Sequence, residues 1–343
     1  MKVDIILNEY DSPRAMAEQA ALAESYGIRA IWSTSYATGR DPFLSLALAA
    51  QSTSKILLGP LAVSPMELHP LKITQELLTL NELCDGRAII AVGAGGGVLA
   101  SMGIKRSQMV ESVRECVEII RAALTGEDVT YEGDIYTAYQ FDARWAKDLP
   151  PPQIYVGASR ERMSYMATEK ADGLMGSDLI PPLIRMTRGW VDKGLAQHER
   201  TGQPFGVSNF WAWHIKKDKE AARREACREL VLRGILRPRY TELLLSKEDS
   251  DFVQENKSLF WRAFASGAGT IDGAPAHIVD TLIDGLSSTG DLGDIDREIE
   301  RFREYAALGL TEIALRVHGD PIDAITLIGE RIVPALVSDT DGV

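Results

Sequence analysis

The chain has 343 residues, of which 45% are hydrophobic and 25% charged, and it carries a formal net charge of −12. This composition is typical of a globular protein with a sizeable core, and the scattered basic residues argue against a nucleic acid or an anionic membrane surface as partner. No apolar run approaches the roughly 18 residues of a membrane helix, and the apolar start of the chain is too short for a signal peptide. We therefore expect a cytoplasmic protein whose three widely spaced cysteines are reduced.

Strand and helix signals alternate from the first residues onward. Ser12 and Pro13 are typical of a helix start, and Gly27 is typical of its end. Buried strands are predicted at residues 3–7, 29–33, 56–58, 87–92, 154–157, 173–175, 207–215 and 312–317. Helices are predicted at residues 13–26, 41–53, 71–83, 106–124, 161–170, 181–200 and 322–336.

Strands that alternate with helices predict an α/β fold with a parallel sheet, because parallel strands need crossover connections. An open doubly wound sheet and a closed (β/α)8 barrel (a TIM barrel) both fit this alternation. Eight strands, and the absence of a G-x-G-x-x-G run at the first helix, favour the barrel. We expect a single domain over residues 1–343 with two additions, a polar and aromatic excursion at about 126–152 and a largely helical insertion at about 219–290.

The loop after the fourth predicted strand is a candidate ligand site. Its sequence, Gly93-Ala94-Gly95-Gly96-Gly97, lets the backbone turn sharply or approach a ligand more closely than a Cβ would allow. In a (β/α)8 barrel the active site lies at the carboxyl ends of the strands. The other candidates at such ends are residues 8–9, 33–36, 62–64, 158–160, 177–178, 211–214 and 316–318.

A second candidate loop contains Ala158, Ser159 and Arg160, between a predicted strand and a predicted helix. Free backbone N–H groups and the positive end of the helix favour an anion there. Ser159 is a suitable helix N-cap, and Arg160 could bind a phosphate with two hydrogen bonds. The alternative is a capped helix with a solvent-facing arginine. No cluster of His, Cys, Asp or Glu has metal-ligand spacing, so we predict no metal site.

The order of several motifs resembles the luciferase-like monooxygenase superfamily. These motifs are LGP-x(3)-SP-x(3)-HP, a helix, and then DGR-x(4)-VGAGGG, with further likeness in AESYGIRAIWS, IYVGASRERMSYMATEKADG and IDGAPAHIVDTLIDGL. Within the superfamily, the chain is most similar to the branch that uses the deazaflavin coenzyme F420, such as methylenetetrahydromethanopterin reductase. The likeness extends from about residue 2 to residue 336, and it rests on the order and spacing of the motifs rather than on any one of them.

The resemblance implies a TIM barrel, F420 as cofactor, a small-molecule substrate and a homodimer. In this branch the third strand has a bulge with a non-proline cis peptide, which falls near Leu61 and Ala62 here and against which the deazaflavin ring packs. The loops that hold the cofactor phosphate correspond to the two candidate loops above. The implied cofactor-binding residues are Leu61, Ala62, Ser64, Gly93, Ala94, Gly95, Gly157, Ala158, Ser159 and Arg160.

The chain departs from the sugar and alcohol dehydrogenases of this branch at two places. They have Asp-His after the second strand, where this chain has Ser35 and Tyr36, and a glutamate in the fourth-strand loop, where it has Gly96-Gly97. Alcohol oxidation needs a base near the hydroxyl, so these departures favour reduction of an activated C=C or C=N bond. The candidate proton donors are Tyr36, Glu9 and His214.

Two other functions remain open. The chain could be an FMN-dependent monooxygenase of the same superfamily, which would consume oxygen, or a non-catalytic flavin-binding protein. The substrate is not encoded in a readable pocket pattern. Arg40, Arg237 and Arg239 could attract an acidic substrate, although a solvated surface is the favoured interpretation of these residues.

Overall fold

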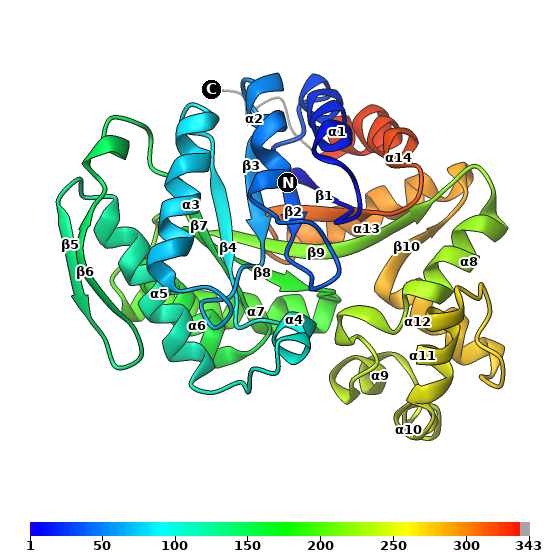
Figure 1. Ribbon diagram of the computed structural model, residues 1–343. Helices are drawn as coiled ribbons and strands as arrows, with labels where there is room; N and C mark the ends of the chain where they lie inside the picture. The colour runs from blue at the N-terminus through cyan, green and yellow to red at the C-terminus, as the bar shows by residue number, and fades with distance from the viewer. Residues whose placement is uncertain (337–343) are drawn as a thin grey trace.

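The computed structural model describes residues 1–336, apart from the side chain of residue 233; residues 337–343, which the single-domain prediction included, lie outside it. Eight parallel strands follow each other around a barrel in the order β3-β2-β1-β11-β9-β8-β7-β4. Bridges from Leu58 to Ala88 and from Val63 to Val92 join β3 to β4 and close it. The strands are β1 (Lys2–Leu7), β2 (Ala30–Thr34), β3 (Leu57–Leu61), β4 (Ile89–Val92), β7 (Gln153–Gly157), β8 (Gly173–Ser177), β9 (Gly206–Ile215) and β11 (Glu312–Val317). The (β/α)8 prediction is confirmed (Figure 1).

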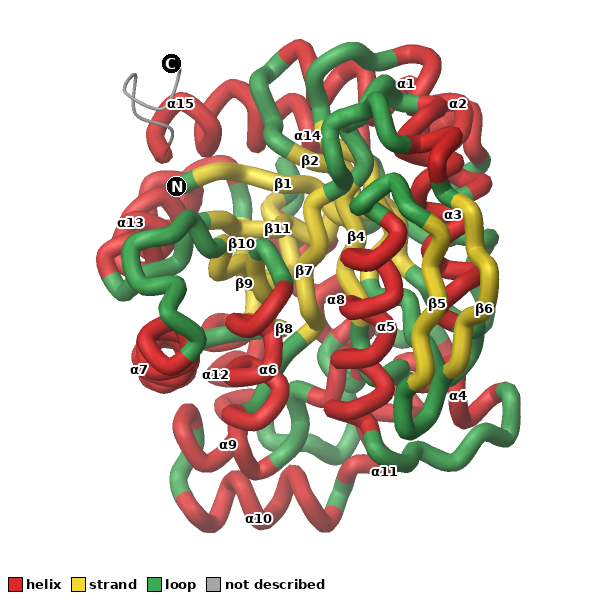
Figure 2. Tube along the Cα trace, turned by 90° about the vertical axis from the view of Figure 1, so that its left-hand side faces the viewer, coloured by secondary structure: helices red, strands yellow, loops and turns green. Residues whose placement is uncertain are grey.

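Helices surround the barrel on the outside, as Figure 2 shows. The first of them begins as predicted, because the Ser12 hydroxyl accepts a hydrogen bond from the Ala15 amide and Pro13 is the first helical residue. The helices of the barrel layer are α1 (Pro13–Ser25), α2 (Ala47–Ser52), α3 (Pro70–Leu83), α5 (Met109–Ala123), α6 (Glu161–Lys170), α7 (Pro181–Gln197), α13 (Ile295–Ala307) and α14 (Pro321–Leu327). No helix in the described residues combines the length and the apolar character that a membrane span requires.

The interior of the barrel is filled by alternate residues of the strands, as the two-residue period of a strand requires. Ile6, Trp32, Tyr155 and Phe210 belong to this apolar cluster. At the amino ends of the strands the barrel is closed by polar groups. There the buried Asp4 carboxylate accepts hydrogen bonds from the Trp32 indole and from the Arg29 guanidinium. The carboxyl ends of the strands are therefore the side at which a ligand can enter.

Two additions extend the barrel. Within the excursion, β5 (Asp128–Glu132) and β6 (Thr137–Asp142) form an antiparallel pair. The insertion forms a lobe beside the barrel in Figure 1 and contains α8 (Lys219–Glu229), α9 (Pro238–Leu244), α10 (Lys247–Glu255), α11 (Lys257–Ser266), α12 (Ala276–Leu286) and β10 (Ser287–Gly290).

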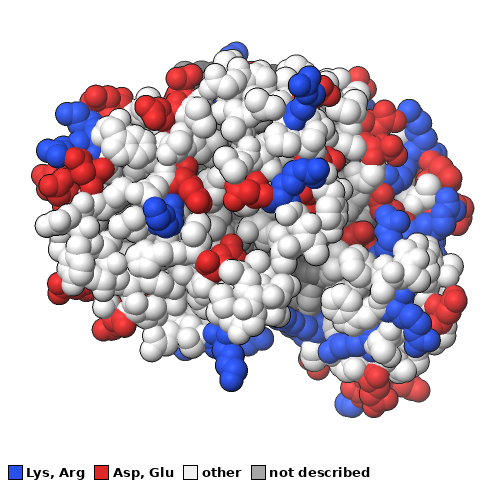
Figure 3. All heavy atoms as spheres, in the orientation of Figure 1, with Lys and Arg blue, Asp and Glu red and all other residues white. Residues whose placement is uncertain are grey.

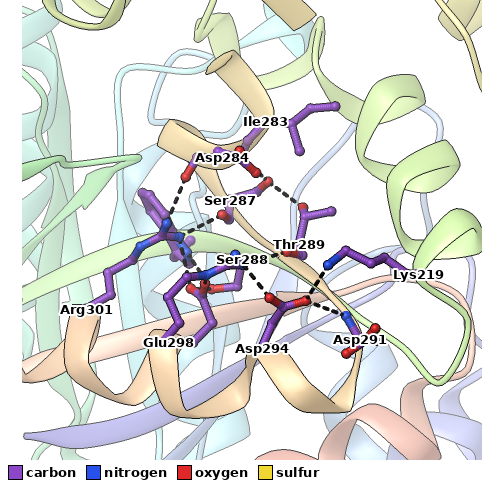
Figure 4. A network of polar contacts seen from close by, with 12 residues as sticks. Lys219, Ile283, Asp284, Ser287, Ser288, Thr289, Asp291, Asp294, Glu298 and Arg301 are labelled. Carbon is purple, nitrogen blue, oxygen red and sulfur yellow. Dashed lines mark hydrogen bonds and ion pairs between the residues drawn. The ribbon is translucent and has the colours of Figure 1, made fainter. Parts of the chain in front are cut away.

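Strand β10 was not predicted, because its sequence, SSTG, has no apolar residue. It pairs in parallel with the end of β9, and polar contacts hold it in place (Figure 4). The Ser288 hydroxyl donates to the buried Glu298 carboxylate over 2.6 Å, and Arg301 donates to the Ser287 carbonyl over 2.8 Å. This strand is thus stabilised by hydrogen bonds to α13 rather than by side-chain hydrophobicity.

Three predicted helices differ from the structure. The helix expected at 41–53 begins only at residue 44, because the Asp41 carboxylate binds the amides of Phe43 and Leu44 in a local turn. The helix expected at 106–124 begins at Met109, after Gln108 with a φ of 44°, and is preceded by the short α4 (Gly97–Ser101). The last helix, expected at 322–336, contains a π-helical turn (Ile328–Ile332) between α14 and α15 (Val333–Leu336).

Candidate active site

Three small residues meet at the carboxyl ends of neighbouring strands β3, β4 and β7. A Cβ added to Gly93 would lie 3.0 Å from the Ala62 Cβ, and one added to Gly157 would lie 3.6 Å from the Gly93 Cα. The peptide bond between Leu61 and Ala62 is cis, which confirms that implied feature. We call Ala62, Gly93 and Gly157 the small-residue wall. The absence of larger side chains lets a flat ligand approach the backbone here.

Apolar side chains form the floor beneath this wall. Leu61, Met175 and Phe210 belong to the barrel-interior cluster and are nearly buried, and Ala62 packs against the same cluster. A site with an apolar floor and a few polar groups at its rim is typical of small-molecule and cofactor pockets.

The loop after the cis peptide is fixed by its own contacts. The Ser64 hydroxyl is buried and accepts a hydrogen bond from the Met66 amide over 3.2 Å. Gly95, at a φ of 71°, comes so close that an added Cβ would lie 3.1 Å from this hydroxyl. The two loops are therefore closely packed at Ser64 and Gly95, and Ala94 between Gly93 and Gly95 is half-buried.

The second candidate loop differs from the prediction at Ser159. The backbone stays extended through Arg160, which is itself the N-cap residue of α6 and makes no side-chain capping bond. The prediction that Ser159 caps this helix is therefore wrong, because the helix begins at Glu161 and the residue directly before it is Arg160. The Ala158 amide donates to the Met175 carbonyl over 3.0 Å, so an anion would meet the amides that follow it rather than that of Ala158. The side chains of Ser159 and Arg160 are exposed.

Glu9 lies in a buried ion pair. Its Oε2 accepts a hydrogen bond from Arg316 Nη2 over 2.5 Å and one from the Thr34 hydroxyl over 3.3 Å. Arg316 also donates to the Leu7 carbonyl. Because Oε2 is already engaged by Arg316 and Thr34, this arrangement weighs against Glu9 as the group that meets the substrate.

Ser35 and Tyr36 stand on the loop after β2, and Tyr36 is 42% exposed. The Ser35 hydroxyl donates to Glu67 Oε1 over 3.1 Å, while Glu67 Oε2 is buried and has no hydrogen-bond partner among the described residues. Burial raises the pKa of Glu67. The sequence analysis missed Glu67, although a lone charged residue between Pro65 and Pro70 was a signal that could have identified it.

His214 is buried near the end of β9 and is fixed against the helical insertion. Its Nδ1 lies 2.9 Å from Glu225 Oε1 on α8, and its ring stacks on His318 at 4.6 Å between centroids. Burial raises the pKa of Glu225, but hydrogen bonds to His214 and Lys216 outweigh this effect, so the pKa is lowered overall. A cavity of about 430 Å³ lies nearby and is lined by Trp213 and His318, but it contains no residue of the small-residue wall.

Within residues 1–336, one group of carboxylates could approach a metal ion. Glu111, Glu115 and Asp134 have oxygens within 4.8 Å of one another. The Glu115 oxygens, however, already accept hydrogen bonds from the amides of Asp134, Ile135 and Tyr136. The Glu115 carboxylate thus anchors the turn between β5 and β6 to α5.

Comparison with known proteins identifies the family. The model of the luciferase-like monooxygenase family matches residues 3–312. The chain belongs to this family. This confirms the resemblance found in the sequence and agrees with the barrel described above.

Curated relatives include enzymes named for F420 chemistry. The chain is 29% identical over 321 residues to a 5,10-methylenetetrahydromethanopterin reductase of Archaeoglobus fulgidus, covering 92% of this chain and 93% of the relative. It is 28% identical over 326 residues to the reductase of Methanolobus tindarius, covering 93% and 95%. An F420-dependent glucose-6-phosphate dehydrogenase of Kineococcus radiotolerans is 27% identical and covers 60% of this chain and 70% of the relative.

Solved structures share the fold. The coenzyme F420-dependent tetrahydromethanopterin reductase of Methanopyrus kandleri superposes with a TM-score of 0.79 at 22% identity, covering 98% of this chain and 100% of that one. A type II Baeyer–Villiger monooxygenase in complex with FMN, from Pseudomonas putida, gives 0.67 at 16% identity, covering 98% and 99%. Both cofactors therefore occur on this fold, and the fold alone does not select between them.

Proposed function

We propose that the protein binds coenzyme F420 and transfers a hydride between it and a small organic substrate. The observation that carries this proposal is the small-residue wall of Ala62, Gly93 and Gly157 beside the cis peptide. The wall offers a flat ring a surface without side chains above an apolar floor. The named F420 enzymes among the relatives support the same cofactor.

The residues at the wall fit this cofactor. Leu61 and Ala62 would support one face of the deazaflavin ring, and Ser64 holds the loop behind it. The phosphate would lie between the two candidate loops, formed by Gly93, Ala94 and Gly95 and by Gly157, Ala158, Ser159 and Arg160. When bound, F420 supplies or accepts the hydride, and the protein orients it and excludes water.

We further propose that the reaction is the reduction of an activated C=C or C=N bond. Such a reduction consumes a proton, and a carboxyl whose pKa is raised by burial is suited to hold one. Glu67 is such a group, joined to Ser35 at the position where related dehydrogenases have Asp-His. Tyr36, next to Ser35, is the candidate for direct proton donation, whereas Glu9 is engaged by Arg316 and His214 by Glu225.

A panel of anaerobic assays tests this function. Reduced F420 is mixed with conjugated enones and imines, and oxidised F420 with secondary alcohols, while absorbance follows the cofactor. We expect oxidation of reduced F420 by an unsaturated acceptor. Turnover of alcohols alone would contradict the proposed direction, and oxygen consumption with reduced FMN would favour the monooxygenase alternative. Tight F420 binding without any turnover would favour a non-catalytic binding protein.

We also propose that two copies associate. Leu44, Leu48 and Leu83 are exposed around α2 and α3, and Leu44 and Leu83 line an apolar hollow of about 290 Å³. Exposed leucines grouped in this way are typical of an interface. Light scattering of the purified protein should give twice the mass of one chain, and substitution of Leu44 by Glu should shift it to the monomer.

A further inference from the structure

The helical insertion brings an arginine to the mouth of the barrel. The Tyr240 hydroxyl, on α9, donates to the Ser177 carbonyl at the end of β8 over 2.9 Å. Strand β8 pairs with β7, whose following loop carries Arg160. This contact holds Arg239, the neighbour of Tyr240, at the same end of the barrel as Arg160.

Neither arginine has an acidic partner among the residues that the structure describes. No ion pair in the described part of the chain includes Arg160 or Arg239, and Arg239 Nη2 is buried without a hydrogen-bond acceptor. Burial, and then the charge of Arg160, lower the pKa of the Arg239 guanidinium. The chain has 49 acidic residues against 37 basic ones, so two adjacent arginines without a carboxylate are unexpected.

Such an arrangement is unfavourable unless a ligand completes it. A buried donor without an acceptor costs free energy, and so does repulsion between like charges. An anion between the two guanidinium groups would remove both costs, and arginine suits phosphate and carboxylate because it can donate two parallel hydrogen bonds. Figure 3 shows basic side chains where the lobe of α9–α12 meets the barrel.

We propose that Arg160 and Arg239 form an anion site, in which the insertion and the barrel together grip a phosphate or carboxylate group of the bound ligand. The inference rests on the proposed function, because the anion belongs either to the phosphate-bearing side chain of F420 or to an acidic substrate. The site is chemically distinct from the loop amides, since it adds a charged group from α9. It corrects the interpretation of Arg239 as part of a solvated surface, while Arg237 is exposed as expected.

Equilibrium binding separates the two sources. Tryptophan fluorescence of the full chain is titrated with F420 and with the deazaflavin ribitol precursor that lacks the phosphate, at constant ionic strength. Inorganic phosphate is tested separately by its effect on the unfolding temperature. The variants are Arg239→Gln, Arg160→Gln and the charge-conserving Arg239→Lys, and the matched control is Arg262→Gln, an exposed arginine of the same lobe.

We expect Arg239→Gln and Arg160→Gln each to weaken F420 binding by about tenfold or more and to leave binding of the precursor unchanged, with Arg239→Lys intermediate. If the anion belongs to the substrate, F420 binding stays constant but phosphate stabilises the wild type and no longer stabilises the two Gln variants. Unchanged F420 binding together with equal phosphate stabilisation in all variants overturns the anion site. If the wild type binds neither deazaflavin, the proposed function fails, and the phosphate measurement still decides this inference.

Discussion

The Ser35 hydroxyl donates a hydrogen bond to Glu67 over 3.1 Å, and the Ser35 amide donates to the Leu61 carbonyl over 2.8 Å. Ser35 thus connects a buried carboxyl group to the residue that begins the cis peptide. The second Glu67 oxygen is buried without a partner among the described residues. A proton held on Glu67 would lie one hydroxyl away from the candidate cofactor site.

The raised pKa of Glu67 predicts a pH-dependent stability. The folded protein holds the Glu67 proton more tightly than the unfolded chain does, and this difference stabilises the fold. The stabilisation is fully present below the pKa that Glu67 has in the unfolded chain, and it is lost as pH rises through the pKa that Glu67 has in the folded protein. Glu67→Gln removes that loss. Relative to the wild type, the variant should therefore gain unfolding free energy as pH rises above about 4, where an unperturbed glutamate ionises, measured by urea denaturation. The exposed Glu18→Gln serves as control, and an equal pH dependence of wild type and Glu67→Gln would contradict the assignment.

The ion pair between Glu9 and Arg316 predicts a non-additive pair of substitutions. Arg316→Ala leaves the Glu9 carboxylate buried without its charged partner and should lower the unfolding free energy by about 3–5 kcal/mol. Replacing both groups by apolar residues, Arg316→Met with Glu9→Leu, should cost less than Arg316→Ala alone. Denaturant titration of the variants measures this difference. If the losses of unfolding free energy from changing Glu9 and Arg316 simply add, the two side chains do not stabilise each other.

The small-residue wall predicts a loss of affinity without a loss of fold. In Gly157→Ala the new Cβ would lie 3.6 Å from the Gly93 Cα and 3.7 Å from the Ala62 Cβ, which are ordinary contacts. The chain should fold, but the methyl group would occupy the ligand's place and weaken F420 binding by about 1–3 kcal/mol, the usual cost of overpacking. Gly189→Ala, where an added Cβ meets no atom within 4 Å, is the control. Equal affinities of both variants would place the cofactor elsewhere.

The three cysteines should be inert in the native protein. Cys84, Cys116 and Cys227 are free thiols, as predicted from the sequence, and all three are buried. Burial raises the pKa of each thiol, and the thiolate is the reactive form. A chromogenic disulfide reagent at mildly alkaline pH should label all three only after unfolding. Rapid labelling of any of them in the native state would contradict their burial.

Sequence alone predicted the barrel because each strand of a parallel sheet is an apolar run buried on both faces. All eight barrel strands were found, and Gly59 in β3 is explained by the fold, since a Cβ there would lie 1.7 Å from the Ile89 carbonyl oxygen. Strand β10 escaped detection because polar contacts to α13 stabilise it. Such contacts join residues that are distant in the chain.

The sequence predicted the features of the candidate site that belong to the backbone. It predicted only some of the features that depend on contacts between side chains. The glycine loops and the cis peptide were identified from motifs. The Ser159 cap was wrong by one residue, which is within the usual uncertainty of a helix boundary. Glu67 and Arg239 acquire their significance from Ser35 and Arg160, which lie on other loops, and no local pattern reports such pairs.

The central claim is that this site holds F420 in preference to FMN. Titration of the purified protein with each cofactor, followed by quenching of its six tryptophans, tests this directly, with Gly157→Ala measured in parallel. The account predicts micromolar or tighter binding of F420, weak binding of FMN, and a loss of F420 affinity in the variant. Preferential binding of FMN, or F420 binding that the variant leaves unchanged, would contradict it.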